Sequence, residues 1–236
     1  MSVLQESHKR TVHTLIEALP YIRKFARATM VVRPGGVALA SPQLAAGLAQ
    51  DVALLKLVGM RPVVVLGDEP PPPDGPAVVD LISAQGGTVM ELSSGIGPAG
   101  RVSLQVVELL PHDVIPVVLA GAGGRGAAVP TADPDVIAGE LAAAIGAEKL
   151  VFLSDAGGVL EQDGFEQDVV SECDLAYLGA LQAAGKIDGE LLPKVSAVRR
   201  ALDGGVRSAH VIDGRVEHAV LLEVLTDAGC GTKITK

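Results

Sequence analysis

The chain has 236 residues, 48% of them hydrophobic, and carries a formal net charge of −9 at pH 7. An acidic chain with only 2% aromatic residues lacks the basic, stacking surface that binds nucleic acid. No run approaches the roughly 18 to 20 apolar residues of a membrane span, and the polar start at residues 2–9 is unlike a secretory signal. We therefore expect a soluble, cytoplasmic protein whose partners include neither nucleic acid nor membrane.

Small aliphatic residues dominate the expected core, because tryptophan is absent and the chain has only three phenylalanines and two tyrosines. Such a composition favours a parallel sheet packed closely between alanine-rich helices. Cys173 and Cys230 are too few for a disulfide framework or a zinc site, so we predict no metal site and treat both as small apolar residues of a reduced protein.

The first predicted element is a helix over residues 12–25, in which apolar residues recur at helical spacing. Pro20 lies within this segment and should bend or restart the helix. The apolar stripe either packs on its own domain or pairs with another subunit. Its members are Val12, Leu15, Ile16, Leu19 and Ile22.

Five short aliphatic runs have the length of buried strands, and helical segments lie between several of them. The runs span residues 29–32, 62–66, 114–119, 149–153 and 208–212. Four of them end in a glycine-containing or acidic turn, and ligands of open parallel sheets bind at the carboxyl ends of the strands. Those turns are the predicted site. The segment 93–100 and the glycine-rich segment 121–128 are predicted loops, and a helix is expected over 136–145, with Asp133 or Asp135 as its cap.

Motifs in both halves resemble those of one enzyme family. The C-terminal half contains Gly189-Glu-Leu-Leu-Pro-Lys194-Val, then His210-Val-Ile-Asp213-Gly214-Arg215, then a segment at 221–232 with Glu223, Gly229 and Gly231. Together with segments at 18–21, 31–36 and 63–67, these motifs resemble N-acetylglutamate kinase, a member of the amino-acid kinase family. The resemblance covers about residues 15–234.

The resemblance implies a three-layer α/β/α sandwich around a mainly parallel sheet, formed by a single domain over residues 1–236. Within it, 1–27 would be a kinked N-terminal helix, 28–147 an acceptor lobe and 148–236 a nucleotide lobe. Enzymes of this kind transfer the γ-phosphoryl group of ATP, used with Mg²⁺, to the side-chain carboxylate of N-acetyl-L-glutamate in arginine biosynthesis.

The implied catalytic residues are Arg33, Lys194 and Asp135. Arg33 stands where the family has a lysine, Lys194 is the lysine on the ATP side, and Asp135 organises the two cations. Lys194 could otherwise be a solvated lysine at a helix start.

The implied acceptor side has Gly35, Gly36 and Gly67 as amide donors for the phosphoryl oxygens, and Asp133 where the family has an acceptor-binding asparagine. Asp68 and Glu69 replace two glycines of the triplet that begins at Gly67. If they face the site, they should repel phosphate and an acidic acceptor. If they turn outward, they are ordinary solvated turn residues.

The chain between Gly67 and Ile115 is shorter than the family pattern, and it contains no counterpart of the Gly-Leu-Arg motif that holds the acceptor carboxylate. Three hypotheses follow: a kinase with impaired or altered activity, a catalytically silent member that binds nucleotide or arginine as a regulatory or assembly partner, or a kinase for a different, cationic acceptor.

The resemblance also implies two ligand sites in the C-terminal half. The residues implied for nucleotide binding are Asp155, Ala156, Gly157, Gly158, Val159, Leu160, Gly189 and Lys194. A site for arginine would use Glu223, Gly229 and Gly231, together with the N-terminal helix, which interlocks dimers into a hexamer in arginine-inhibited members. The alternatives are that the glycines and Asp155 only form turns, and that Glu223 is a surface residue of the last helix with the two glycines as its C-cap.

Overall fold

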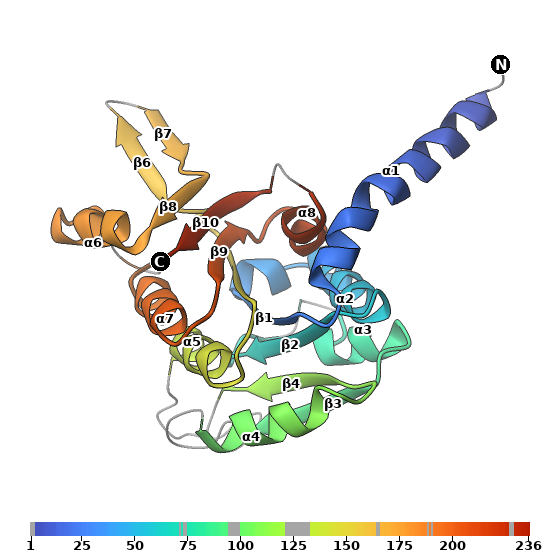
Figure 1. The fold of residues 1–236 in the computed structure, drawn as a ribbon, viewed down its shortest axis with the longest axis horizontal. Helices are drawn as coiled ribbons and strands as arrows, with labels where there is room; N and C mark the ends of the chain where they lie inside the picture. Colours follow the sequence, from blue (N-terminus) through green and yellow to red (C-terminus); the bar gives the residue numbers. More distant parts are fainter. Residues whose placement is uncertain are drawn as a thin grey trace.

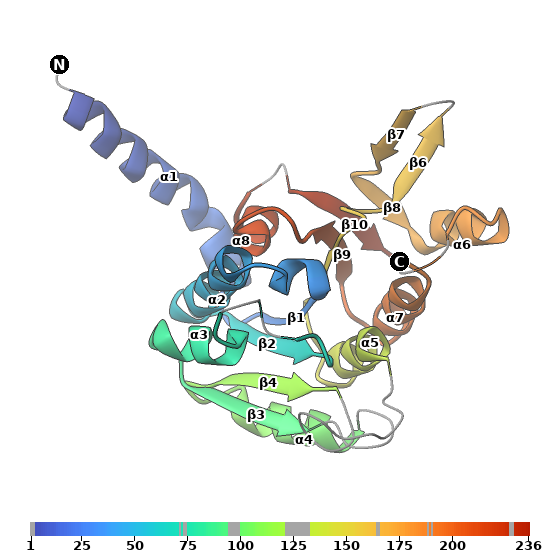
Figure 2. The ribbon, with the colours of Figure 1, turned by 180° about the vertical axis from the view of Figure 1, so that it is seen from behind.

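The structure is a computed structural model that describes residues 3–70, 72, 75–93, 100–120, 133–163, 166–187, 189, 191–226 and 229–236. Among these residues, an eight-stranded sheet lies between two layers of helices (Figures 1 and 2). The predicted three-layer α/β/α fold is therefore confirmed. No helix in the described part of the chain is long and apolar enough to cross a membrane.

The sheet has the strand order β3-β4-β2-β1-β5-β9-β10-β8 and is mainly parallel. Its strands are β1 (Thr29–Pro34), β2 (Arg61–Leu66), β3 (Val89–Ser93), β4 (Ile115–Leu119), β5 (Lys149–Ser154), β8 (Glu172–Asp174), β9 (Ser208–Asp213) and β10 (Gly231–Thr235). The antiparallel contact joins β9 and β10. All five predicted strands are present, and β1, β2, β5 and β9 are almost wholly buried, as their aliphatic sequences indicated.

Helices cover both faces of the sheet, and each layer has its own apolar cluster. One face is covered by α2 (Pro42–Leu57), α3 (Val78–Ala84) and α8 (Ala219–Leu225), with a 3₁₀ turn at Gly36–Leu39. The other face is covered by α4 (Gly100–Leu109), α5 (Pro134–Ala144), α6 (Leu175–Ala183) and α7 (Leu191–Asp203). A separate hairpin of β6 (Leu160–Asp163) and β7 (Glu166–Val169) extends beyond the sheet (Figure 1).

The N-terminal helix α1 (Val3–Phe25) projects from the body of the molecule (Figures 1 and 2). Pro20 lies inside it, so the proline does not end the helix. Of the predicted apolar stripe, Val12, Leu15, Ile16 and Leu19 are all exposed, with Leu15 at 65%. These side chains do not pack on their own domain in this structure.

Several elements were missing from the sequence prediction. The edge strands β3 and β8, the antiparallel β10 and the β6-β7 hairpin are short or mostly polar, so they lack the aliphatic runs that revealed the central strands. The predicted helix over 136–145 is confirmed as α5, shifted by two residues at its start. The predicted loop at 121–128, and residues 94–99 of the other loop, lie outside the described residues.

Candidate active site

Arg33, Asp135 and Lys194, the three predicted catalytic residues, meet at the carboxyl edge of the sheet. Asp135 forms ion pairs with both cations: its Oδ1 lies 2.9 Å from Arg33 Nε, and its Oδ2 lies 3.1 Å from Lys194 Nζ. All three side chains are less than 10% exposed. The alternative interpretation of Lys194 as a solvated lysine is therefore wrong. The cluster lies beside β1, which separates β2 from β5, where open sheets of this kind bind ligands.

The approach of α5 to α7 places Asp135 against Lys194. Gly139 permits it, because a Cβ atom there would lie 2.5 Å from the carbonyl oxygen of Ala197 on α7. Asp133 is the N-cap of α5, and its Oδ1 accepts a hydrogen bond from the Asp135 amide at 2.8 Å. Asp133 thus has the capping role that was one of its two interpretations, and it fixes the start of the helix that presents Asp135.

The two acidic side chains of the turn after β2 point in different directions, one toward solvent and the other toward the site. Asp68 is exposed, whereas the Glu69 side chain is only 17% exposed and turns back toward β1. Glu69 Oε1 lies 2.5 Å from Arg33 Nη2, and Oε2 accepts a hydrogen bond from the Gly67 amide at 2.8 Å. Of the two open interpretations, Glu69 therefore follows the one that faces the site and Asp68 the one that turns outward, because only the Glu69 side chain contacts Arg33 and a backbone donor.

The glycines predicted as amide donors have different roles. The Gly35 amide donates to the Leu153 carbonyl at 2.9 Å, so the sheet uses it, and the prediction that it is available to a ligand is wrong in this structure. Gly36 begins the 3₁₀ turn and is exposed. A Cβ on Gly67 would lie 2.6 Å from Pro134 Cγ and 2.8 Å from Glu69 Oε2, so this position tolerates only glycine without rearrangement.

The turn predicted to bind nucleotide borders a cavity of about 640 Å³. Asp155, Ala156, Gly157 and Leu160 line it together with Asp213 and Arg215. Gly158 and Val159 do not. A Cβ on Gly158 would lie 2.6 Å from Val169 Cγ1, and Val159 is a buried core residue whose amide donates to Thr232 Oγ1 at 2.8 Å. These two residues hold the turn against β10. Gly189 is exposed, has a φ of +50° and is not part of this cavity wall.

Arg215 provides positive charge at the rim of this cavity. Its guanidinium donates to both oxygens of Asp213, with both distances at 2.8 Å, and its side chain is 60% exposed. The hydrogen bond from Arg215 lowers the pKa of Asp213 below its ordinary value, which keeps this carboxylate ionised. A bidentate donor at an open rim suits a phosphate or carboxylate ligand.

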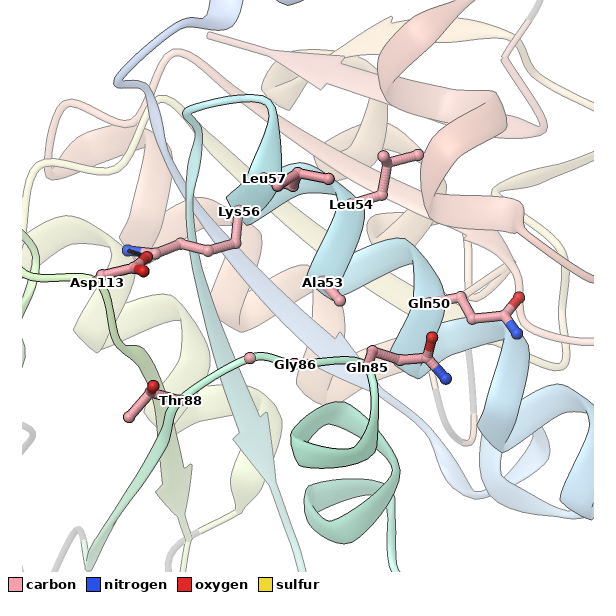
Figure 3. Close-up of a pocket in the computed structure, with 10 residues that line it drawn as sticks. Gln50, Ala53, Leu54, Lys56, Leu57, Gln85, Gly86, Thr88 and Asp113 are labelled. Carbon is pink, nitrogen blue, oxygen red and sulfur yellow. Dashed lines mark ion pairs between the residues drawn. The ribbon is translucent and has the colours of Figure 1, made fainter.

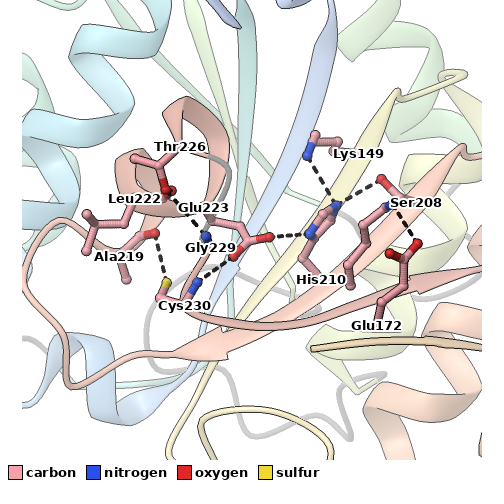
Figure 4. A network of polar contacts seen from close by, with 11 residues as sticks. Lys149, Glu172, Ser208, His210, Ala219, Leu222, Glu223, Thr226, Gly229 and Cys230 are labelled. Carbon is pink, nitrogen blue, oxygen red and sulfur yellow. Dashed lines mark hydrogen bonds and ion pairs between the residues drawn. The ribbon is translucent and has the colours of Figure 1, made fainter. Parts of the chain in front are cut away.

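A second polar network surrounds Glu223 on α8 (Figure 4). Glu223 Oε1 lies 2.6 Å from His210 Nδ1, and Oε2 accepts from the Cys230 amide at 2.9 Å. His210 Nε2 lies 2.9 Å from Ser208 Oγ and 3.3 Å from Lys149 Nζ. Glu223 is 7% exposed, so its interpretation as a surface residue is wrong.

Burial sets the protonation of this network. It lowers the pKa of His210, although the hydrogen bond with Glu223 acts in the opposite direction. Burial alone would raise the pKa of Glu223, but the bonds from His210 and the Cys230 amide outweigh it and lower that pKa. Burial also lowers the pKa of Lys149. A neutral His210 that donates from Nδ1 to an ionised Glu223 satisfies both groups.

A cavity of about 330 Å³ opens beside this network, between α1 and the C-terminal strands. Glu223, Gly229 and Gly231 line it, as predicted, and so do Lys149, His210 and Tyr21. The two glycines are not the C-cap of α8, which is Thr226. A Cβ on Gly231 would lie 2.1 Å from the Val211 carbonyl oxygen, so glycine there allows β10 to pair with β9. Lys149 and His210 were missed, although a charged and an ionisable residue within buried aliphatic strands are a usable signal.

A third cavity, of about 280 Å³, lies at the other edge of the sheet (Figure 3). Its walls come from the C-terminal part of α2 and from Gln85, Thr88 and Asp113, which precede β3 and β4. This edge holds the amino ends of parallel strands, where such sheets rarely place a ligand site. Among the described residues, no group of three or more His, Cys, Asp or Glu residues could hold a metal ion.

Comparisons with known proteins agree with this geometry. The family model for the amino acid kinase family matches residues 100–213. Acetylglutamate kinase from Nostoc punctiforme is 33% identical over 283 aligned residues, covering 98% of this chain and 95% of the relative. The chain belongs to the amino acid kinase family. Chloroplastic acetylglutamate kinase from Arabidopsis thaliana is likewise 33% identical, over 95% of this chain and 80% of its own.

Solved structures of other proteins share the fold. N-acetylglutamate synthase from Neisseria gonorrhoeae, complexed with coenzyme A and N-acetyl-glutamate, has a TM-score of 0.78 at 20% identity. The match covers 95% of this chain and 63% of the synthase. Carbamate kinase from Giardia lamblia, bound to AMP-PNP, has a TM-score of 0.67 at 15% identity over 89% of this chain and 99% of its own.

The alignment with the Nostoc kinase also bears on chain length. It spans 283 positions whereas this chain has 236 residues, so at least 47 aligned positions of the relative have no residue here. The chain is therefore shorter than the kinase over the aligned region, and that the difference lies between Gly67 and Ile115 stays a prediction of the sequence.

Proposed function

We propose that the chain binds ATP with Mg²⁺ and transfers the γ-phosphoryl group to a carboxylate such as N-acetyl-L-glutamate, at a rate well below that of a complete acetylglutamate kinase. The observation that carries this proposal is the buried cluster in which Asp135 holds Arg33 and Lys194 side by side. Transfer between two anions is catalysed mainly by positioning and by positive charge along the line of transfer. Two oriented cations at the carboxyl edge of the sheet supply that charge.

The proposed low rate has two physical causes. Glu69 pairs with Arg33, so part of the positive charge is already neutralised. Arg33 is also a planar guanidinium that bridges two carboxylates, and it cannot present a single compact charge to the phosphoryl group as a lysine would.

We place the nucleotide in the cavity of about 640 Å³, with the turn at Asp155 to Gly157 on one side and Arg215 at the rim. The glycine turn lets the ligand approach the backbone, and Arg215 can exchange part of its bond with Asp213 for a phosphate oxygen. We assign no protein ligands to Mg²⁺, since in kinases this ion commonly binds through substrate phosphates and water.

The test is acyl phosphate formation from MgATP and N-acetyl-L-glutamate, trapped with hydroxylamine. Lys194→Gln should abolish product, whereas Lys186→Gln, an equal change of charge at an exposed position, should leave it unaltered. In calorimetry, Arg215→Ala should weaken ATP binding by roughly tenfold, the effect of losing one charge-assisted pair. Absence of product from the unaltered protein with saturating substrates would reject the kinase proposal.

A second candidate is a catalytically silent member that binds arginine and acts as a regulatory partner. The cavity lined by Glu223, Gly229 and Gly231 favours it, because a carboxylate and turn carbonyls suit a guanidinium ligand. N-acetylglutamate synthase from Neisseria gonorrhoeae, whose fold is similar at a TM-score of 0.73, has been solved with coenzyme A and L-arginine. Calorimetry with arginine tests this candidate, since binding should be lost in Glu223→Gln and kept in Glu217→Gln, an exposed acid near the start of α8.

We further propose that the chain assembles into homo-oligomers, a dimer or a hexamer built through α1. The exposed stripe of Val12, Leu15, Ile16 and Leu19 supports this, because an apolar helix face of that extent is usually covered by a partner. Light scattering should give a smaller particle for Leu15→Glu than for the unaltered protein. An unchanged mass would remove α1 from the interface.

A further inference from the structure

The side chain of Glu69 occupies a corner made by β1, β2 and the start of α5. Its carboxylate takes one contact from the Arg33 guanidinium, at 2.5 Å, and one from the Gly67 amide, at 2.8 Å. Its Cγ lies 4.0 Å from where a Cβ on Gly36 would be. The neighbouring residues Asp68 and Pro70 are exposed. A charged side chain from an exposed turn has therefore folded into the site.

The partners of Glu69 are those of an anion site. A backbone amide directly after a strand and a buried guanidinium together bind carboxylates, phosphates and sulfates. The corner is also tight, because Gly67 has Pro134 on one side and the Glu69 carboxylate on the other, each within 3 Å of a hypothetical Cβ. The space next to the Gly67 amide is thus filled by the chain itself.

The charges of the cluster balance when Glu69 is counted. Arg33 pairs with Glu69 and Asp135, and Lys194 pairs with Asp135, so two cations face two carboxylates. A phosphoryl group entering the corner must compete with a carboxylate only two residues from the amide it needs. Such a tethered competitor has an effective concentration far above that of a free anion.

We propose that Glu69 is an internal anion that fills the phosphoryl-binding corner, and that a tetrahedral oxyanion binds at Arg33 and the Gly67 amide only after this side chain has turned out to solvent. The inference rests on the proposed function for the identity of the ligand group. In the state seen here, the Glu69 carboxylate occupies the corner, and an incoming phosphate must displace it.

The experiment is a titration with inorganic phosphate at constant ionic strength, followed by calorimetry and by the ¹H-¹⁵N resonance of the Gly67 amide. Glu69→Ala should bind phosphate at least about tenfold more tightly than the unaltered protein, with a shift of the Gly67 resonance. Asp68→Ala is the matched control. It changes the net charge equally but lies on the exposed side of the turn, so its phosphate affinity should equal that of the unaltered protein.

The inference is overturned if Glu69→Ala binds phosphate no better than Asp68→Ala, or if the Gly67 resonance of the unaltered protein shifts at the same phosphate concentration as that of Glu69→Ala. Should Glu69→Ala fail to fold, Glu69→Gln, which keeps the shape and removes the charge, is titrated in its place and must show the same direction of change. Acyl phosphate assays on the same variants separate the two proposals. A gain in phosphate affinity without product rejects the kinase alone, and product without a gain rejects the internal anion alone.

Discussion

The Arg33 side and the C-terminal side of this molecule differ in the space that is left beside their charged residues. In the cluster of Arg33, Glu69, Asp135 and Lys194, each cation is paired with a carboxylate of the chain, and the side chains fill the space between β1, β2 and α5. On the other side, cavities of about 640 and 330 Å³ remain beside Arg215 and Glu223.

Under the proposed function, that difference separates ligand binding from chemistry within one fold. Burying the ion cluster makes it rigid but leaves little unbalanced charge for a substrate, whereas the open cavities keep room for one. The glycines follow the same division. Gly67 and Gly139 allow parts of the protein to approach each other closely, whereas Gly157, with a φ of +71°, forms the wall of a cavity.

The largest effect should come from breaking the buried cluster. Asp135→Asn removes the carboxylate that faces both Arg33 and Lys194, and an uncompensated buried charge costs about 3 to 5 kcal/mol of unfolding free energy. Urea denaturation at pH 7 measures it. The control is Glu140→Gln on the same helix, whose partner Arg200 is 55% exposed, and it should cost less than about 1 kcal/mol. Equal losses of unfolding free energy in the two variants would mean that the buried ion pairs of Asp135 stabilise the protein no more than the exposed ion pair of Glu140.

A smaller effect should follow from separating α5 and α7. In Gly139→Ala, the new methyl group would lie 2.5 Å from the Ala197 carbonyl oxygen, so the helices must shift, at a cost of about 1 to 3 kcal/mol. Gly179→Ala on α6 is the control, because its nearest neighbour is 3.8 Å away, and a helical alanine there should stabilise by up to about 1 kcal/mol. Because α5 and α7 carry Asp135 and Lys194, the shift should disturb the ion cluster, while ligand binding in the C-terminal cavities should persist in Gly139→Ala. Loss of that binding would contradict the separation of the two sides.

The sequence predicted the central fold better than it predicted the sites. All five predicted strands are almost wholly buried on both faces, and that burial requires the continuous aliphatic runs by which they were found. The edge strand β3, with its partly exposed side chains, leaves no such pattern. The group of Arg33, Asp135 and Lys194 was predicted from the family resemblance, and the structure brings them together because a strand end and two helix starts meet at one edge of the sheet.

Side-chain directions in turns could not be predicted in the same way. Asp68 and Glu69 are adjacent acids, and only the backbone geometry decides that one meets Arg33 while the other meets solvent. The Lys149, His210 and Glu223 network depends on β5, β9 and α8 together, so the sequence can single out Lys149 and His210 within their strands but not their contact with each other and with Glu223.

The smallest predicted effect concerns pH and the C-terminal network. Burial lowers the pKa of His210 in the folded protein below its ordinary value of 6.5. Between these two pKa values, His210 is protonated in the unfolded chain and neutral in the folded chain. Stability should therefore fall on acidification between pH 6.5 and the folded pKa of His210, by at most about 1.4 kcal/mol per pH unit for this one proton. His210→Gln should flatten that slope in urea denaturation between pH 7 and 5. His13→Gln, which changes a histidine on α1 with a 73% exposed side chain, should leave it unchanged. If His210→Gln retained the slope, as the control should, the acid sensitivity would arise outside the C-terminal network.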